Sequence, residues 1–363
     1  MRIDPLSTLR HIAGVISCMA ILIAATAGTA PRRAPTPVVG YAAVINRLAG
    51  TPTSLDSLYS EAVRRRLALD SIIAVDGSAL LGEKLSAVRV LQRLRIDPKF
   101  VIHDPDSIVR AYANGLERAR GKLPRLFDTV TDGPIRMQSI PVEQAASAAP
   151  AAYVRADTGK QADSATFLVN AHQPGGIARM NILLGIAHEA YPGHHFQTMY
   201  ALAHGMSPDP TPDNEAFVEG WGIYAERLAD EAGLYDGDSI ARLGYFTHLY
   251  DVFMSLQIDI GIHARGWTHA AAVDTMMMVA GRPRSQAESY ANRHAATPGQ
   301  LATYGIGFTS IVHQRERAES ALGRRFDLAR FHAIVLSDGS TTLAALDTRV
   351  TRWIDQVRQT GEP

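Results

Sequence analysis

The sequence predicts a mainly α-helical protein that also contains one small β-sheet. Apolar residues recur every three or four positions from Leu55 to about Leu123, and helical patterns resume after Gly175-Gly176 and run almost to the C-terminus. Between Gly133 and Asn170 the apolar runs are short and are separated by Pro, Asp and Gly, which is typical of strands and turns. A chain of 363 residues, 46% of them hydrophobic, is long enough to bury a full core around these elements.

The first residues have the pattern of a secretory signal peptide. Arg2 and Arg10 precede an apolar stretch from Ile12 to Ala27, which is shorter than the ~20 residues that a membrane span needs. We therefore interpret residues 1–27 as a signal peptide and residues 28–40 as a linker. This interpretation predicts a secreted or periplasmic protein with no membrane span after cleavage. An uncleaved anchor or a lipoprotein is the alternative.

The composition limits the partners that the mature chain can attract and the residue types that can bind a metal. Lysine plus arginine and aspartate plus glutamate number 36 each, so no field of one sign attracts nucleic acid, and we expect no nucleic-acid partner. Cys18 is the only cysteine and lies within the expected signal peptide. A metal site in the mature chain must therefore use His, Asp and Glu side chains.

The elements divide the mature chain into two regions. In residues 41–130 apolar positions such as Leu81, Leu85 and Val88 repeat at helical intervals, so we predict an N-terminal region of amphipathic helices. Residues 131–355 form the second region, which we interpret as catalytic. It begins with the predicted sheet at about 133–170 and continues with long helices.

One apolar helix carries a histidine and a glutamate into the interior. The segment from Met180 to Tyr191 is strongly apolar ahead of His188 and Glu189, which is the texture of a buried helix. Burying an imidazole and a carboxylate without partners costs several kcal/mol, and a divalent cation satisfies such a cluster. The alternative is an ordinary polar patch at a helix end.

A Pro-Gly break separates this pair from two further histidines. In the usual zinc-peptidase motif the second histidine follows the first by four positions, but here that position is Pro192. Pro192 clashes with the carbonyl of His188, and Gly193 permits backbone angles that other residues avoid. We therefore predict a bulge that brings His194 beside His188. His195 is the alternative ligand, because it returns to the same helix face but about 10 Å along the axis.

A later helix supplies a carboxylate as the third ligand. Glu219 and Glu226 are seven positions apart and share one helix face. Gly220 and Gly222 each cost about 1 kcal/mol relative to alanine, which is explained if another helix approaches closely there. Two solvated glutamates are the alternative. Two imidazoles and one carboxylate suit zinc, and the predicted ligands are His188, His194 and Glu219.

Two ten-residue strings in these segments resemble the signatures of a known family. His188 to Gln197 reads HEAYPGHHFQ, and Phe217 to Glu226 reads FVEGWGIYAE. Both resemble the bacterial family catalogued as domain of unknown function 885, a member of the zincin-like metallopeptidase clan with an HExxPGHH signature. The resemblance runs from about Leu81 to Trp353. Three further segments are similar, at 259–267, 298–307 and 326–339.

The resemblance implies a zincin-like helical fold with the small sheet beside the active-site helix. It implies a zinc-dependent metallopeptidase, in which metal-activated water attacks the bond of a peptide substrate and Glu189 is the general base. It favours His194 over His195 as ligand. Similar enzymes place a Tyr or His from a later helix at the oxyanion, so Tyr304 and His263 are the further catalytic candidates.

Three more residues receive supporting roles. Glu226 is expected to orient a ligand histidine by accepting its free ring hydrogen. Asp259 shares a helix face with the second oxyanion candidate and is expected to support the ligands from behind, or to form a simple local hydrogen bond. Arg315 is expected to hold a substrate carboxylate through a bidentate contact, and a surface salt bridge with Glu316 or Glu319 is the alternative.

Members of the resembled family are usually much longer before the signature, so we expect a shortened N-terminal helical region here. This favours a second hypothesis, in which a catalytically impaired relative acts as a periplasmic peptide-binding or scaffold protein. The intact Glu189 argues against that hypothesis. In a third hypothesis the same site hydrolyses an ester or an amide that is not a peptide.

Overall fold

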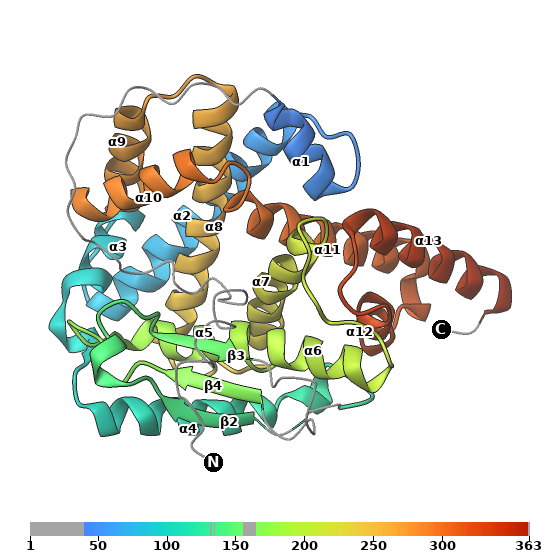
Figure 1. The fold of residues 1–363 in the computed structure, drawn as a ribbon, viewed down its shortest axis with the longest axis horizontal. Coiled ribbons are helices and arrows are strands. Elements are labelled where there is room, and N and C mark those ends of the chain that lie inside the picture. The colour runs from blue at the N-terminus through green and yellow to red at the C-terminus, as the bar shows by residue number, and fades with distance from the viewer. Residues whose placement is uncertain (1–39, 131–132, 134, 155–164, 362–363) are drawn as a thin grey trace, which may run out of the picture.

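The computed structural model describes residues 40–130, 133, 135–154 and 165–361, and it confirms the mainly helical fold with small sheets (Figure 1). The predicted signal peptide, and all of the predicted linker except Gly40, lie outside the described residues. Within the described part of the chain, no helix combines the length and the apolar character needed to span a membrane.

The helices begin where local sequence offers a cap. Ser54, Asp104 and Thr342 each accept a hydrogen bond from a backbone amide in the first turn of the helix that follows. The helices of the described residues are α1 (Tyr41–Ala49), α2 (Leu55–Leu81), α3 (Ala87–Ile96), α4 (Pro105–Arg120), α5 (Ile182–Glu189), α6 (His194–Ala203), α7 (Glu215–Glu231), α8 (Ser239–Ala264), α9 (His269–Ala280), α10 (Arg284–Ala296), α11 (Ala302–Leu322), α12 (Leu328–Leu336) and α13 (Leu343–Thr360).

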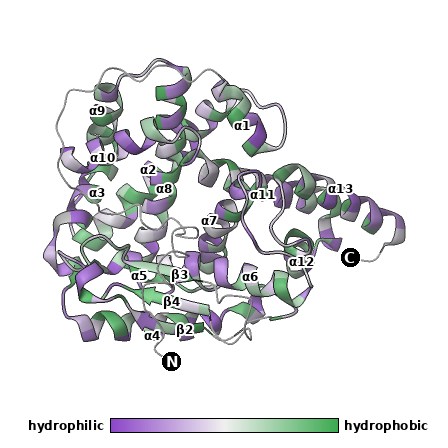
Figure 2. Cartoon of the chain, in the orientation of Figure 1, coloured by the Kyte–Doolittle hydropathy of each residue, from purple (hydrophilic) through white to green (hydrophobic). Residues whose placement is uncertain are grey.

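Helix α8 is the central element of the core. Helices α2, α9, α10 and α11 pack against it, and most of its residues from Tyr245 to His263 are buried. A helix that is apolar on all sides is typical of such a surrounded position. The outer helices bury one face only, and Figure 2 shows hydrophilic and hydrophobic residues alternating along α13. Polar side chains on α8 are therefore held in the interior.

The predicted sheet is present as three strands next to α5. Strand β2 (Ile135–Ser139) pairs in parallel with β4 (Ala165–Val169), and β3 (Ala151–Val154) pairs antiparallel with the other side of β4. The edge strand β3 lies beside α5 (Figure 1). The sequence missed a second pair, β1 (Val101–Ile102) with β5 (Ile177–Ala178), because two residues carry no detectable alternation.

Candidate metal centre

The segment between the histidines is a complete break between two helices. Helix α5 ends at Glu189 and α6 begins at His194, with a cis peptide bond between Tyr191 and Pro192. The predicted break at Pro192 and Gly193 is therefore present, but it separates two helices instead of bulging one, because α6 begins anew at His194. The indole Nε1 of Trp221 on α7 donates to the carbonyl oxygen of Pro192 at 3.0 Å and so anchors the break.

Gly193, the residue before α6, makes room for the end of α5. Its φ of −75° and ψ of −138° lie together outside the main regions that residues with a side chain occupy, as predicted. A Cβ at this position would lie 1.8 Å from the carbonyl oxygen of His188. The missing side chain thus allows the second helix to start directly against the end of the first.

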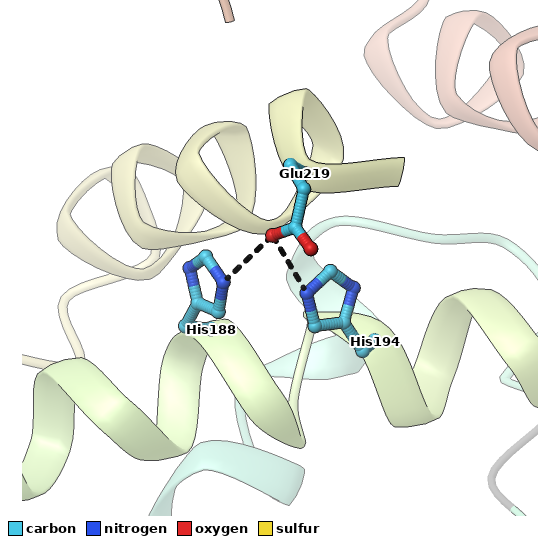
Figure 3. A group of neighbouring side chains, drawn as sticks. All are labelled: His188, His194 and Glu219. Atoms are coloured by element: carbon cyan, nitrogen blue, oxygen red, sulfur yellow. Dashed lines mark ion pairs between the residues drawn. The ribbon is translucent and has the colours of Figure 1, made fainter. Parts of the chain in front are cut away.

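The three predicted ligands lie together in the structure. His188 from α5 and His194 from α6 have ring centroids 4.8 Å apart, and Glu219 reaches toward both rings from α7 (Figure 3). The Oε2 atom of Glu219 is 3.7 Å from Nε2 of His188 and 3.6 Å from Nε2 of His194. All three side chains are buried, and one ligand atom from each lies within 4.8 Å of the others.

This arrangement fits a single metal ion. Zinc bonds of about 2.0–2.1 Å in a tetrahedron place ligand atoms about 3.3–3.4 Å apart, which is close to the two spacings between Glu219 and the imidazoles. Nε2 of His194 and Oε2 of Glu219 are buried with no hydrogen-bond partner among the described residues. Buried polar atoms without partners are rare in proteins, and a cation at this point would satisfy both.

Glu226 orients the first ligand histidine. Its Oε1 accepts a hydrogen bond of 2.8 Å from Nδ1 of His188, which leaves Nε2 facing Glu219. Burial alone would lower the pKa of His188, but the nearby carboxylates of Glu219 and Glu226 outweigh it and raise this pKa well above the ordinary value.

The histidines in turn lower the pKa values of the two glutamates that face them. Burial would raise the pKa of Glu219, but the nearby imidazoles of His188 and His194 lower it to about 2. Glu226 likewise has a lowered pKa, because His248 and His188 outweigh the effect of burial. Both groups are consequently anionic at neutral pH, which is the form that binds a metal or orients an imidazole.

Sequence reasoning missed His248 on α8. Its Nδ1 lies 2.9 Å from Oε2 of Glu226, and its ring centroid is 6.1 Å from that of His188. Glu226 therefore bridges two histidines. The available signal was a polar residue within the apolar run from Tyr245 to Met254, which only a tertiary contact explains.

The glycines of α7 make room for close neighbours, as predicted. A Cβ on Gly222 would lie 2.6 Å from Cε1 of His188. A Cβ on Gly220 would lie 2.4 Å from the backbone of Gly307 on α11. The first glycine thus admits a ligand ring, and the second admits another helix.

The predicted general base lies at the same site. Oε2 of Glu189 accepts a hydrogen bond of 3.3 Å from the backbone amide of Tyr153, on the free edge of β3. Oε1 is buried with no hydrogen-bond partner among the described residues. Burial raises the pKa of Glu189, against the opposing effect of His194 and His188. The carboxylate therefore binds protons more readily than an exposed glutamate does.

Comparison with known proteins places the chain in a family. A family model described as "Bacterial protein of unknown function (DUF885)" matches residues 11–350. The chain belongs to this family. The resemblance seen in the two signature strings of this DUF885 protein is thereby confirmed at the level of the family. No curated protein matches the chain.

Two solved structures share the fold of this DUF885 protein. One is a candidate lipoprotein from Colwellia psychrerythraea, with 25% sequence identity and a TM-score of 0.78, covering 87% of this chain and 55% of that one. The other is a candidate lipoprotein of unknown function from Shewanella oneidensis, with 21% identity and a TM-score of 0.69, covering 85% of this chain and 58% of that one. The chain thus spans less than two thirds of either.

Tyr304 is the oxyanion candidate that lies near the ligands. Its ring stacks at 25° to that of His188, with centroids 6.4 Å apart. Both residues line a cavity of about 220 Å³ that opens beside the ligand group. Helix α11 thus brings a phenol toward the first ligand histidine.

The other oxyanion candidate, His263, lies elsewhere. It follows His248 by fifteen positions on α8, about 22 Å along the axis. Its Nε2 donates to the carbonyl oxygen of His294 at 2.9 Å. Asp259 belongs to the same distant cluster and accepts hydrogen bonds from Tyr41, His294 and the amide of Gly299. The predicted roles of both residues at the metal site are therefore wrong, because one long helix separates them from it.

Two further predictions are corrected by contacts. His195, the alternative ligand, turns away from the group, and its Nε2 donates to the carbonyl oxygen of Gly133 at 2.9 Å. Arg315 forms ion pairs with Glu231 at 2.7 Å and Glu319 at 2.8 Å. Its guanidinium is thus engaged by protein carboxylates, as in the salt-bridge alternative, and it is not among the described residues that line the cavity.

Proposed function

We propose that this protein is a zinc-dependent peptidase of the zincin type, with His188, His194 and Glu219 as metal ligands. The observation that carries the proposal is the convergence of three buried ligand atoms from three separate helices. Two of these atoms lack any other partner among the described residues, and Glu226 occupies the ring nitrogen of His188 that faces away. In a cluster with a purely structural role, each buried polar atom would be expected to have a hydrogen-bond partner within the protein.

The chemistry follows from the residues around the ligands. Zinc held there supplies a Lewis acid that polarises a carbonyl group and lowers the pKa of water. Glu189 takes the proton from the attacking water and passes it to the leaving amine, and its raised pKa suits a group that must hold the proton between these steps. Tyr304 is assigned as hydrogen-bond donor to the carbonyl oxygen of the substrate.

Metal analysis tests the ligand set. Purified wild type is expected to bind one zinc per chain, and His188→Ala, His194→Ala and Glu219→Ala are each expected to lose it. His195→Ala is the matched control, because this histidine is equally buried and adjacent but contacts Gly133. Retention of zinc by His194→Ala, with loss in His195→Ala, would refute the assignment.

Turnover tests the reaction. Wild-type protein is expected to cleave members of a synthetic peptide library, whereas Glu189→Gln should keep its zinc and lose about 10²- to 10⁴-fold in rate. An ester panel run in parallel separates a peptidase from a hydrolase of other acyl compounds. Bound zinc, no cleavage of either panel and tight binding of intact peptides would favour a peptide-binding protein instead.

We also propose that the protein acts outside the cytoplasm. Both similar solved structures are described as candidate lipoproteins. Arg2, Arg10 and the apolar stretch from Ile12 to Ala27 have the order of a secretory signal. Fractionation of cells that produce the full chain should place it with periplasmic or membrane fractions, and recovery with cytoplasmic markers alone would contradict this.

A further inference from the structure

Two arginines, the half-buried Arg95 and the buried Arg282, line the same cavity as His188 and Tyr304. Arg95 comes from α3, and Arg282 comes from the turn between α9 and α10 (Figure 1). Both pair with a single carboxylate, Asp251 on α8, whose Oδ2 lies 2.5 Å from Nη2 of Arg282 and 3.5 Å from Nη2 of Arg95. Two cations therefore share one anion, and the cluster carries an excess positive charge within the cavity wall.

The hydrogen bonds of this cluster are incomplete. Arg282 is 4% exposed, yet its Nε and Nη1 have no hydrogen-bond partner among the described residues. Its guanidinium carbon lies 4.3 Å from the ring centroid of Tyr290, so this ring covers one face of the guanidinium plane. Oδ1 of Asp251 also has no hydrogen-bond partner in the described part of the chain, so the three charged groups do not satisfy all of one another's hydrogen bonds. Buried donors without acceptors are costly, above all on a charged group.

The missing partner has a recognisable chemistry. A guanidinium presents its donors in a planar fork that matches the two oxygens of a carboxylate. Burial lowers the pKa of Arg95, and the neighbouring charge of Arg282 adds to this effect. A second anion would relieve both the repulsion and the unsatisfied donors.

The cluster lies within reach of the metal ligands. Asp251 follows His248 by three positions, about 4.5 Å along α8, and the ring of His248 is 6.1 Å from that of His188. An extended peptide spans about 3.3–3.6 Å per residue. A substrate whose scissile bond lies at the ligands could therefore place a carboxylate at the arginines with one to three intervening residues.

We propose that Arg95 and Arg282 bind the C-terminal carboxylate of the substrate, so that the enzyme removes one to three residues from the C-terminus of a peptide. This inference rests on the proposed peptidase function. In the reaction the peptide C–N bond breaks, the hydroxyl of one water joins the acyl carbon, and its proton joins the leaving amine. The released fragment keeps the anchoring carboxylate, and the shortened peptide gains a new one.

A purely structural role for the cluster makes a different prediction. Arg95 also donates to the carbonyl oxygen of Ala280, so the cluster ties α3 and the end of α9 to α8. Loss of such a tie would lower stability without altering the preference between two peptides. Discrimination between a free C-terminus and an amidated one is therefore the informative measurement.

Binding to an inactive variant tests the subsite apart from turnover. The probe is a library of synthetic hexapeptides made with free C-terminal carboxylates, as C-terminal amides, and as amides that end in glutamate. Zinc-loaded Glu189→Gln is expected to bind the free acids at least about tenfold more tightly than the plain amides. Equal affinities would overturn the proposal. Recovery of full affinity by the glutamate amides would overturn the assignment to the C-terminus and move it to an acidic side chain.

Substitutions of the two arginines test whether they cause the preference for free C-terminal acids. In the same background Arg282→Gln and Arg95→Gln should each reduce the preference for free acids, and Arg282→Lys should restore it only in part because lysine lacks the fork. Arg66→Gln is the matched control, since Arg66 is also buried but binds Tyr250 outside the cavity lining. An unchanged preference in both glutamine variants would refute the subsite.

Turnover by wild type separates this proposal from the one on which it rests. Cleavage of free acids near the C-terminus, with amides spared, supports both. Cleavage of free acids and amides alike at internal bonds would leave the peptidase function intact and refute the subsite. Selective binding of free acids without any cleavage would support the subsite and contradict the peptidase.

Discussion

The contact between Gly222 and His188 allows a sharp test of the metal centre. An alanine at position 222 would place its Cβ 2.6 Å from Cε1 and 2.8 Å from Nε2 of the imidazole. Since an ordinary contact begins near 3.4 Å, the ring must move by about 0.8 Å, the difference between that value and 2.6 Å. Helix α7 continues on both sides of this position, so the ring and not the helix is the part expected to yield.

The size of the expected effect follows from this movement. Metal–ligand distances tolerate shifts of only about 0.2 Å. Displacing the ring also weakens the 2.8 Å hydrogen bond from His188 to Glu226. We therefore expect Gly222→Ala to lower zinc affinity by at least about 10- to 100-fold, or about 1.4–2.8 kcal/mol. The metal-free protein should change little in stability. The cost of displacing the ring is offset by the helix propensity of alanine, which exceeds that of glycine by about 1 kcal/mol.

The assay is zinc competition against a chromophoric chelator at neutral pH, with thermal unfolding of the metal-free protein alongside. Gly220→Ala is the control on the same helix. Its Cβ would meet the backbone of Gly307 at 2.4 Å, so it should lower the melting temperature and leave the zinc affinity of the folded protein unchanged. Wild-type zinc affinity in Gly222→Ala would refute the placement of His188 as a ligand.

Three further predictions follow from the contacts. Glu226→Ala should lower zinc affinity by about 10- to 100-fold in the same chelator assay, because His188 loses the acceptor that orients it. Asp259→Ala should destabilise the protein by about 2–5 kcal/mol in urea unfolding without altering zinc affinity, since three buried donors lose their acceptor. The lowered pKa of Glu219 implies a contribution to the stability of the metal-free protein that is present above pH 4.5 and lost as the pH falls through about 2. Glu219→Gln should flatten acid unfolding across that window, and an unchanged profile would contradict the pairing with the histidines.

The local pattern of the chain was sufficient for much of the fold and for the core of the candidate site. Helical periodicity is a property of neighbouring residues, so the helices around α8 and the small sheet could be predicted. The same holds for His188 and Glu189, because both lie at the end of one strongly apolar helix. His194 and Glu219 were found because the Pro-Gly break and the α7 glycines mark positions where backbones must approach closely.

Other features depended on packing between segments far apart in sequence. His248 and the arginine pair line the cavity only because α5 packs against α8, and because Asp251 on α8 binds arginines from α3 and from the turn after α9. His263 lies on the same helix as His248, and its residue type alone made it a candidate for binding the oxyanion. Only the length of that helix excludes it from the site.

The sequence by itself determined which residues could bind a metal, since residue types and their spacing are properties of the sequence. The tertiary structure decided which of them meet. A side chain reaches only a few ångströms, and whether two of them share that space depends on how the helices cross.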